Sequence, residues 1–168
     1  MVGEIMRIYL VGLPGCGKST LGKKLAEKIN YKYIDMDQDI EIKACMFIDE
    51  IFKLYGEAYF RALEKNTLKD YQKIDNVIIS TGGGIVNDLS NKKLFDGTCI
   101  YLKADLESVK QRLEQSDIIR PLLQKMTLEE IYEMRKDKYE YFKDIEVIND
   151  NIDIAINQII EELGLWKY

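Results

Sequence analysis

The residues best suited to chemistry lie in a glycine-rich segment near the N-terminus. Residues 12–20 read GLPGCGKST, which matches the pattern G-x-x-x-x-G-K-[ST] between a short apolar run and a helical pattern. The glycines allow the backbone N–H groups to turn inward toward phosphate oxygens, and the following helix adds its positive dipole end. Lys18 is expected to reach the β- and γ-phosphates, and the Ser19 hydroxyl can ligate Mg²⁺. We therefore predict an ATP site made by Gly12, Gly15, Cys16, Gly17, Lys18, Ser19 and Thr20.

Two acidic residues follow in a segment predicted to be extended. Asp35 and Asp37 are two positions apart, so strand geometry would place both carboxylates on one side, with Ile34 and Met36 facing the core. Ligands of parallel α/β sheets gather at the C-terminal ends of the strands, which is where these residues fall. One carboxylate can support Mg²⁺ and the other can orient an acceptor hydroxyl. A solvated acidic turn is the alternative.

Arg61 and a run of three glycines are candidates for contacts with the acceptor. Arg61 lies on a predicted helix with Glu57 at i−4 and Glu64 at i+3, which is typical either of a surface ion-pair network or of an arginine held in place to bind a carboxylate. Gly82–Gly84 follow an apolar strand, and three glycines there favour close approach of the backbone to a ligand over a simple flexible loop.

Two further arginines could act on the reacting groups. Arg120 precedes Pro121 at the end of an irregular segment, where a cation could swing over the phosphates and stabilise the transferring group. Arg135 shares a helix face with Tyr139 at i+4, and from spacing alone it is either a second substrate contact or a surface residue near Asp137.

Short apolar strands and helical patterns alternate along the chain, which predicts a parallel sheet covered by helices on both faces. The strands are predicted at Arg7–Val11, Tyr33–Asp37, Val77–Ser80, Cys99–Leu102 and Ile145–Ile148. The helices are predicted at Lys18–Ile29, Leu106–Leu113, Thr127–Phe142 and Ile152–Leu163. The insertion Asp39–Tyr71 is expected to be helical in two or three pieces, broken near Tyr55–Gly56, and to form a substrate-binding lobe. Thr127 and Glu130 form a capping-box pattern.

Composition excludes several classes of function. The 168 residues fit one domain, and the net charge of −5 argues against nucleic acid as a partner. The chain has no histidine, so histidine-based triads and metal sites are excluded, and its three cysteines form no CxxC pair. NKxD and DxxG motifs are absent, which argues against a GTPase. No apolar run has transmembrane length and the N-terminus lacks a signal-peptide layout, so we expect a cytoplasmic protein without a membrane partner.

Taken together, these motifs resemble the shikimate kinase family in order and spacing over nearly the whole chain. After the phosphate loop, the matching segments are Asp35-Met-Asp37, Ile40-Glu41, Ile48-x-Glu-Ile-Phe52, Gly56-Glu57, Phe60-Arg61-x-x-Glu64, Thr81-Gly-Gly-Gly84, Arg120-Pro-Leu-Leu123 and Arg135-x-x-x-Tyr139.

The resemblance implies a three-layer P-loop NTPase fold with a five-stranded parallel sheet, a helical substrate-binding lobe at about residues 37–72 and a short lid at about residues 114–122. It implies Mg²⁺-dependent transfer of the ATP γ-phosphate to the 3-hydroxyl of shikimate, in aromatic amino-acid biosynthesis. Carried over by position, Lys18, Asp37 and Arg120 are catalytic, with Asp37 as the base, and Ser19 and Asp35 serve the metal. Arg120 also contacts ATP as the lid arginine. The implied shikimate contacts are Asp37, Arg61, Gly82, Gly83, Gly84 and Arg135. We take a monomer as the default oligomeric state.

Some positions depart from the family pattern. Cys45 stands where glycine is usual and Phe47 where a small polar residue is common, and the lid segment Gln115–Ile119 lacks the usual glycines. Lys103 and Lys143 also differ from the residues usual at their positions. Cys16 lies in the phosphate loop near a helix N-terminus that favours thiolate, so it is either an alkylation-sensitive thiol that ATP protects or a small side chain that fills space.

Two alternatives to shikimate phosphorylation stay open from the sequence. The first is another small-molecule kinase of the same fold that acts on gluconate or a nucleoside monophosphate. The second is an ATP-binding regulator without catalysis, for which Asp37 would be dispensable.

Overall fold

A five-stranded parallel sheet forms the centre of the molecule in the computed structural model, which describes residues 6–166. The strands are β1 (Arg7–Val11), β2 (Lys32–Asp35), β3 (Val77–Ser80), β4 (Thr98–Lys103) and β5 (Ile145–Ile148). Their order across the sheet is β2-β3-β1-β4-β5, and every neighbouring pair is parallel. The prediction of a parallel sheet is therefore confirmed, and all five strands point their C-terminal ends toward one edge.

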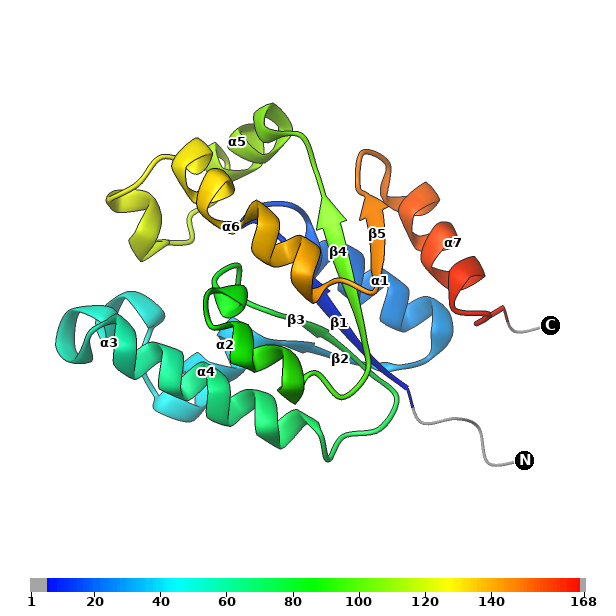
Figure 1. Cartoon of the computed structure of the whole chain (residues 1–168), viewed down its shortest axis with the longest axis horizontal. Coiled ribbons are helices and arrows are strands. Elements are labelled where there is room, and N and C mark those ends of the chain that lie inside the picture. The colour runs from blue at the N-terminus through cyan, green and yellow to red at the C-terminus, as the bar shows by residue number, and fades with distance from the viewer. Residues whose placement is uncertain (1–5, 167–168) are drawn as a thin grey trace.

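Helices cover both faces of the sheet (Figure 1). On one face α1 (Lys18–Ile29) packs against β1, β2 and β3, and α7 (Ile152–Glu162) packs against α1 and β5. On the other face α6 (Leu128–Phe142) crosses β4, and the 3-10 helices η1 (Ile85–Asn87) and η2 (Leu89–Leu94) lie beside it. The central strand β1 is the best shielded, because Ile8, Tyr9, Leu10 and Val11 are fully buried.

A group of three helices extends from the β2 side of the sheet. These are α2 (Met36–Ala44), α3 (Ile48–Tyr55) and α4 (Glu57–Tyr71), which correspond to the predicted helical insertion. The predicted break at Gly56 is confirmed: Gly56 lies between two helices with φ 85°, in the left-handed region that favours glycine. A second break at residues 45–47 separates α2 from α3, and Cys45 ends α2 with φ 51°.

The segment predicted to be a lid joins α5 (Leu106–Glu114) to α6. Residues 115–120 form no regular element, and Pro121–Gln124 form the 3-10 helix η3, which contacts α3. In Figure 1 this segment and α3 lie on the same side of the molecule. The predicted capping box at the start of α6 is present, with Thr127 accepting from the Glu130 N–H at 3.2 Å and Glu130 accepting from the Thr127 N–H at 2.9 Å.

One predicted boundary is wrong. The extended segment was predicted to continue through Asp37, but β2 ends at Asp35 and α2 begins at Met36. The reason is local: Asp35 caps α2 by accepting a hydrogen bond from the Gln38 N–H at 3.2 Å, so the chain turns helical at once. Asp37 therefore lies in the first turn of a helix. Met36 is fully buried, as predicted, while Ile34 is only partly buried.

In the described part of the chain, residues 6–166, no helix has the length and apolar composition needed to cross a membrane.

Candidate functional site

The predicted phosphate loop connects β1 to α1 and is built to receive an anion. Gly15 and Gly17 have φ angles of 78° and 97°, which side chains rarely adopt, and a Cβ on Gly17 would lie 2.5 Å from Asn149. No side chain caps the N-terminus of α1 among the described residues, so its first N–H groups stay available. The Lys18 ammonium lies inside the loop, 2.7 Å from the Gly12 oxygen and 2.9 Å from the Leu13 oxygen.

Ser19 and Asp35 meet beside this loop. The Ser19 hydroxyl donates to Asp35 Oδ2 at 2.9 Å, although the two residues come from α1 and from the end of β2. A hydroxyl oxygen and a carboxylate oxygen at hydrogen-bond distance are hard ligands of the kind that Mg²⁺ takes, with water and phosphate oxygens completing its shell. The donor set therefore fits the predicted metal site.

Asp37 faces the same space from the first turn of α2. Its Oδ1 atom is buried and has no hydrogen-bond partner within the described residues. Burial raises the pKa of Asp37 above its usual value, and the nearby Asp35 carboxylate raises it further, while Lys18, Arg61 and Arg120 act in the opposite direction. An oriented carboxylate without a partner, surrounded by three cations, is suited to accept a hydrogen bond from a hydroxyl group.

Arg61 is held by two carboxylates, as its spacing predicted. Its Nη1 lies 2.5 Å from Glu64 Oε1 and its Nη2 lies 3.3 Å from Glu57 Oε1. The environment is not that of a surface network, because Glu64 is only 1% exposed and Arg61 borders a cavity. Burial raises the pKa of Glu64 to about 7, even though the Arg61 guanidinium acts to lower it.

Arg135 is one of the most deeply buried side chains in the protein. It is 2% exposed, which excludes the alternative of a surface residue near Asp137. Its Nε atom has no partner in the part of the chain that the structure describes. The neighbouring Tyr139 donates its hydroxyl to the Gly83 oxygen at 2.6 Å and so ties this face of α6 to the glycine loop. A buried guanidinium with an unused donor is expected to bind an anion.

The triple glycine lets these side chains reach one place. A Cβ on Gly82 would lie 2.8 Å from Asp37 Oδ1, one on Gly83 would lie 3.0 Å from Arg135 Nη1, and one on Gly84 would lie 2.5 Å from Arg61 Nη2. None of the three glycines has a φ in the left-handed region. Glycine is therefore needed at these positions because side chains approach the backbone closely, and not because the backbone has an unusual conformation. The side chains that approach are those of Asp37, Arg61 and Arg135.

Arg120 lines the cavity from the segment predicted to be a lid. Its guanidinium is within 3.4 Å of the Ser116 hydroxyl and 3.5 Å of the Ile118 oxygen, both in the irregular segment. Burial lowers the pKa of Arg120, while the carboxylates of Asp37 and Asp35 act to raise it. The predicted lid arginine thus faces the two acidic residues of the opposite wall.

All of these groups line one cavity of about 990 Å³. It runs from the phosphate loop at Gly15, Gly17, Lys18, Ser19 and Thr20 to Arg61, Arg135 and the glycine loop. Gly12 and Cys16 do not line it, although the oxygen of Gly12 holds Lys18. Apart from Gly12 and Cys16, the predicted donor and acceptor residues therefore line one cavity.

Several residues that line the cavity or support it from outside were not singled out as site residues from the sequence. Glu64 was noted only as a partner of Arg61, yet its Oε2 atom is buried without a partner among the residues described. Phe47, Phe52 and Phe60 form an apolar wall from the helical lobe. Asn149, at the end of β5, donates to the Cys16 oxygen at 3.0 Å and supports the phosphate loop from behind. No sequence motif marks Asn149, because its role depends on which strand lies beside β4.

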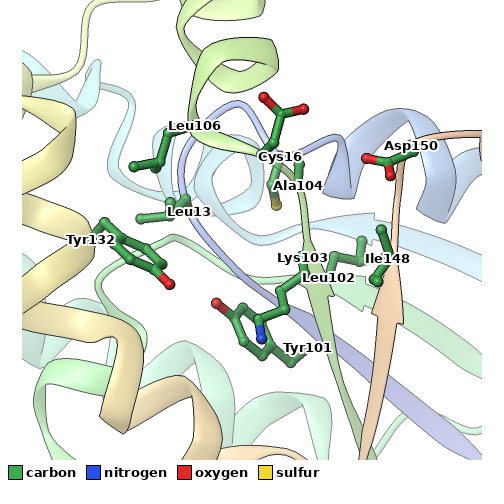
Figure 2. A pocket seen from close by; sticks show the side chains of 11 residues that line it. Leu13, Cys16, Tyr101, Leu102, Lys103, Ala104, Leu106, Tyr132, Ile148 and Asp150 are labelled. Carbon is green, nitrogen blue, oxygen red and sulfur yellow. The ribbon is translucent and has the colours of Figure 1, made fainter.

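Cys16 lies on the other side of the loop. Its side chain is 1% exposed and is directed into a separate pocket of about 300 Å³, opposite Tyr132 of α6 (Figure 2). The sulfur is 3.7 Å from the Lys18 ammonium. The exposure needed for a reactive thiol is therefore absent, and ATP in the main cavity would not meet this side chain directly. The space-filling alternative fits the structure better.

Comparison with known proteins points to one family. The sequence model of the shikimate kinase family matches residues 14–164. A shikimate kinase from Persephonella marina is 43% identical over 136 residues, which cover 79% of this chain and 82% of that relative. One from Clostridium botulinum (strain Loch Maree) is 38% identical over 95% of this chain and 97% of its own. The structure of Acinetobacter baumannii shikimate kinase in complex with shikimate is similar with a TM-score of 0.88 and 30% identity, covering 95% and 94% of the two chains.

Proposed function

The chain belongs to the shikimate kinase family, and we propose that the cavity between its phosphate loop and its triple glycine is where it transfers the ATP γ-phosphate to the 3-hydroxyl of shikimate. The protein is an ATP-dependent kinase with a five-stranded P-loop NTPase fold. The roles of individual residues, the metal and the lid are the further parts of the proposal.

The donor half of the site is the phosphate loop with Lys18 and Ser19. The N–H groups at the start of α1 bind phosphate oxygens, and Lys18 places its positive charge on the β- and γ-phosphates once it exchanges carbonyl partners for phosphate. Ser19 and Asp35 would hold Mg²⁺, which neutralises phosphate charge when bound. Arg120 approaches from the lid and stabilises the negative charge of the transferring group.

The acceptor half is the wall formed by Asp37, Arg61, Arg135 and the glycine loop. Arg61 and Arg135 bind the carboxylate of shikimate, and the glycine loop contacts its ring face. Asp37 orients the 3-hydroxyl and accepts its proton as the oxygen attacks the γ-phosphorus. Catalysis then consists mainly of positioning and of charge neutralisation, as expected for phosphoryl transfer.

The observation that carries this proposal is the pairing of a partner-free buried carboxylate with two guanidinium groups around one glycine loop. The structure describes no other partner for Asp37 Oδ1 or for Arg135 Nε in residues 6–166. A ligand with one carboxylate and a nearby hydroxyl satisfies both at once. A nucleoside monophosphate has no carboxylate for the arginines, whereas gluconate does carry one.

An ADP-release assay with ATP, Mg²⁺ and one acceptor at a time tests this choice. We expect turnover with shikimate and at most a trace with gluconate or a nucleoside monophosphate. Turnover with either of the others, and none with shikimate, would mean that the substrate is assigned wrongly.

We further propose a single domain in which residues 37–72 form the substrate lobe and residues 114–122 the lid, acting as a monomer in the cytoplasm, where ATP is supplied. Size-exclusion chromatography with light scattering measures the oligomeric state.

A further inference from the structure

Glu64 is the buried titratable group of the acceptor pocket that the reaction described above does not use. It is 1% exposed, and one of its oxygens accepts from Arg61 at 2.5 Å. The other oxygen, Oε2, has no hydrogen-bond partner among residues 6–166. A buried carboxylate oxygen without a donor is costly, and it becomes satisfied if it binds a proton and donates instead of accepting.

The surroundings of Oε2 offer an acceptor for such a proton. Glu64 Oε2 and Asp37 Oδ1 lie 3.0 and 2.8 Å from the same point, the position of a Cβ on Gly82. Both atoms are buried and both lack a partner in the described residues. The two carboxyl oxygens are therefore neighbours on the same side of Gly82.

The charged groups around Glu64 act on its pKa in both directions. Arg61 on its own helix and Arg135 on α6 stabilise its ionised form, while burial and the Asp37 carboxylate on α2 favour the protonated form. The glycine loop that completes its surroundings carries no titratable side chain. Arg61 is also shared, because Glu57 binds its Nη2. The two guanidinium groups thus already face the negative charges of Glu57, Glu64 and Asp37 before any ligand binds.

We propose that Glu64 takes up a proton when the carboxylate of the substrate binds to Arg61 and Arg135. The incoming carboxylate competes with Glu64 for the same guanidinium and adds one more negative charge to a buried site. Protonation of Glu64 removes that excess charge and leaves Arg61 for the ligand. Glu64 is in this sense a positioning residue, and the inference rests on the acceptor site proposed above.

The proposal has a defined consequence for pH. Since burial raises the pKa of free Glu64 to about 7 and a bound carboxylate raises it further, binding is favoured when Glu64 is protonated. The dissociation constant of shikimate should be constant near pH 6 and should rise above pH 7, by up to about tenfold per pH unit. Shikimate itself stays ionised over this range, because carboxylic acids titrate near pH 4.

Isothermal titration of the whole protein with shikimate tests the proposal directly. At pH 7.5, titrations in MOPS and in Tris, which differ in protonation enthalpy, should reveal uptake of roughly half to three quarters of a proton per shikimate bound, because free Glu64 is already partly protonated. Shikimate methyl ester, which lacks the charge, should bind more weakly and take up none. Binding of shikimate without proton uptake would overturn the proposal.

Two variants test whether the proton taken up is bound by Glu64 or by another group. Glu64→Gln imitates the protonated acid, so it should bind shikimate without proton uptake and with a dissociation constant that is flat from pH 6 to 8.5. Glu57→Gln removes the exposed partner of the same arginine and should keep the proton uptake of the unmodified protein. If Glu64→Gln does not fold, the measurement on the unmodified protein still decides.

The failure of this inference can be told apart from that of the proposed function. If shikimate is phosphorylated but binds without a proton, only the role of Glu64 is wrong. If shikimate neither binds nor reacts, the acceptor site itself is wrong and the role of Glu64 is wrong with it.

Discussion

At the scale of single residues, Asp37 has the most specific role in the proposed reaction. Because its free oxygen faces the acceptor side of the cavity, Asp37→Asn should lower kcat by about 10²–10⁴-fold through the loss of proton acceptance. The affinity for ATP should change less than about twofold, since the phosphate loop is untouched. Steady-state kinetics and nucleotide titration measure the two quantities.

Asp70→Asn is a matched control for this substitution. Asp70 is exposed on α4 of the same helical lobe, outside the cavity, and its replacement should leave kcat unchanged. Unchanged turnover in Asp37→Asn would instead favour the reading of this chain as a non-catalytic ATP-binding protein.

A substitution at Gly84 tests whether the glycine is needed for the close approach of the Arg61 guanidinium to the backbone. A Cβ there would lie 2.5, 2.7 and 2.8 Å from three atoms of the Arg61 guanidinium, which is the mobile end of a side chain and will move before the backbone does. Gly84→Ala should therefore keep the fold and raise the KM for shikimate about tenfold or more, through weakened charge-assisted hydrogen bonds.

The control for Gly84→Ala is a glycine far from the site. Gly164 has φ 64° with open space around its Cβ position, so Gly164→Ala should cost about 1 kcal/mol of stability through backbone strain and leave KM alone. An unaltered KM in Gly84→Ala would show that Arg61 is not needed where the structure has it.

Sequence spacing made Asp37, Arg61, Arg120 and Arg135 candidates but gave Glu64 no role of its own. An ion pair at i, i+3 has the same spacing whether it is exposed or buried, so Glu64 was seen only as a partner of Arg61. Arg135 likewise was either a ligand contact or a surface residue until its burial excluded the surface. Burial is a property of tertiary packing, and the spacing of two residues on one helix does not contain it.

At the scale of elements, α6 connects the proposed lid to the proposed acceptor site, because it begins at the capping box of Thr127 and carries Arg135 two turns later. Thr127→Ala removes the hydrogen bond to the Glu130 N–H and should lower the free energy of unfolding by about 1 kcal/mol. Urea denaturation measures this loss. Thr127→Ser keeps the oxygen and should recover most of it, and equal losses in both variants would contradict the capping argument.

The elements were largely predictable, since β1, β3 and β5 have the predicted bounds and α1 and α6 differ by one residue at most. Apolar runs and glycine-containing ends mark these elements strongly. The boundary between β2 and α2 was missed because aspartate is compatible both with a strand end and with a helix cap. Only the hydrogen bond from the Gln38 N–H decides between them.

At the scale of the whole molecule, Glu64 should make stability depend on pH. In the unfolded chain it titrates near 4.5, whereas in the folded protein it holds its proton up to about pH 7. The folded state binds more protons at Glu64 between these values, so the contribution of Glu64 to stability is fully present below about pH 4.5 and is lost as pH rises to 7, by about 3 kcal/mol.

Glu64→Gln isolates this contribution. The amide cannot ionise, so the variant should gain stability relative to the unmodified protein between pH 5 and pH 8, by up to the same amount. Urea denaturation at both pH values gives the difference. If the difference in free energy of unfolding between the variant and the unmodified protein stays constant from pH 5 to pH 8, the carboxyl group of Glu64 does not titrate in this range.

The whole-molecule arrangement could be predicted only in outline. A P-loop after the first strand and acidic residues after the second predict one active edge, because parallel strands end together. The meeting of Asp37, Arg61 and Arg135 at one glycine loop depends on α2, α4 and α6 packing around it, and the separate pocket behind Cys16 depends on β4 and α6. Contacts between segments so far apart in the chain leave no local pattern in the sequence.

A crystal structure of the protein with shikimate and ADP tests the central claim most directly. The account predicts the shikimate carboxylate within hydrogen-bond distance of both Arg61 and Arg135, and its 3-hydroxyl within hydrogen-bond distance of Asp37, facing the phosphate loop. Shikimate bound elsewhere, or bound with its hydroxyls toward the arginines and its carboxylate toward Asp37, would contradict the assignment of the acceptor site.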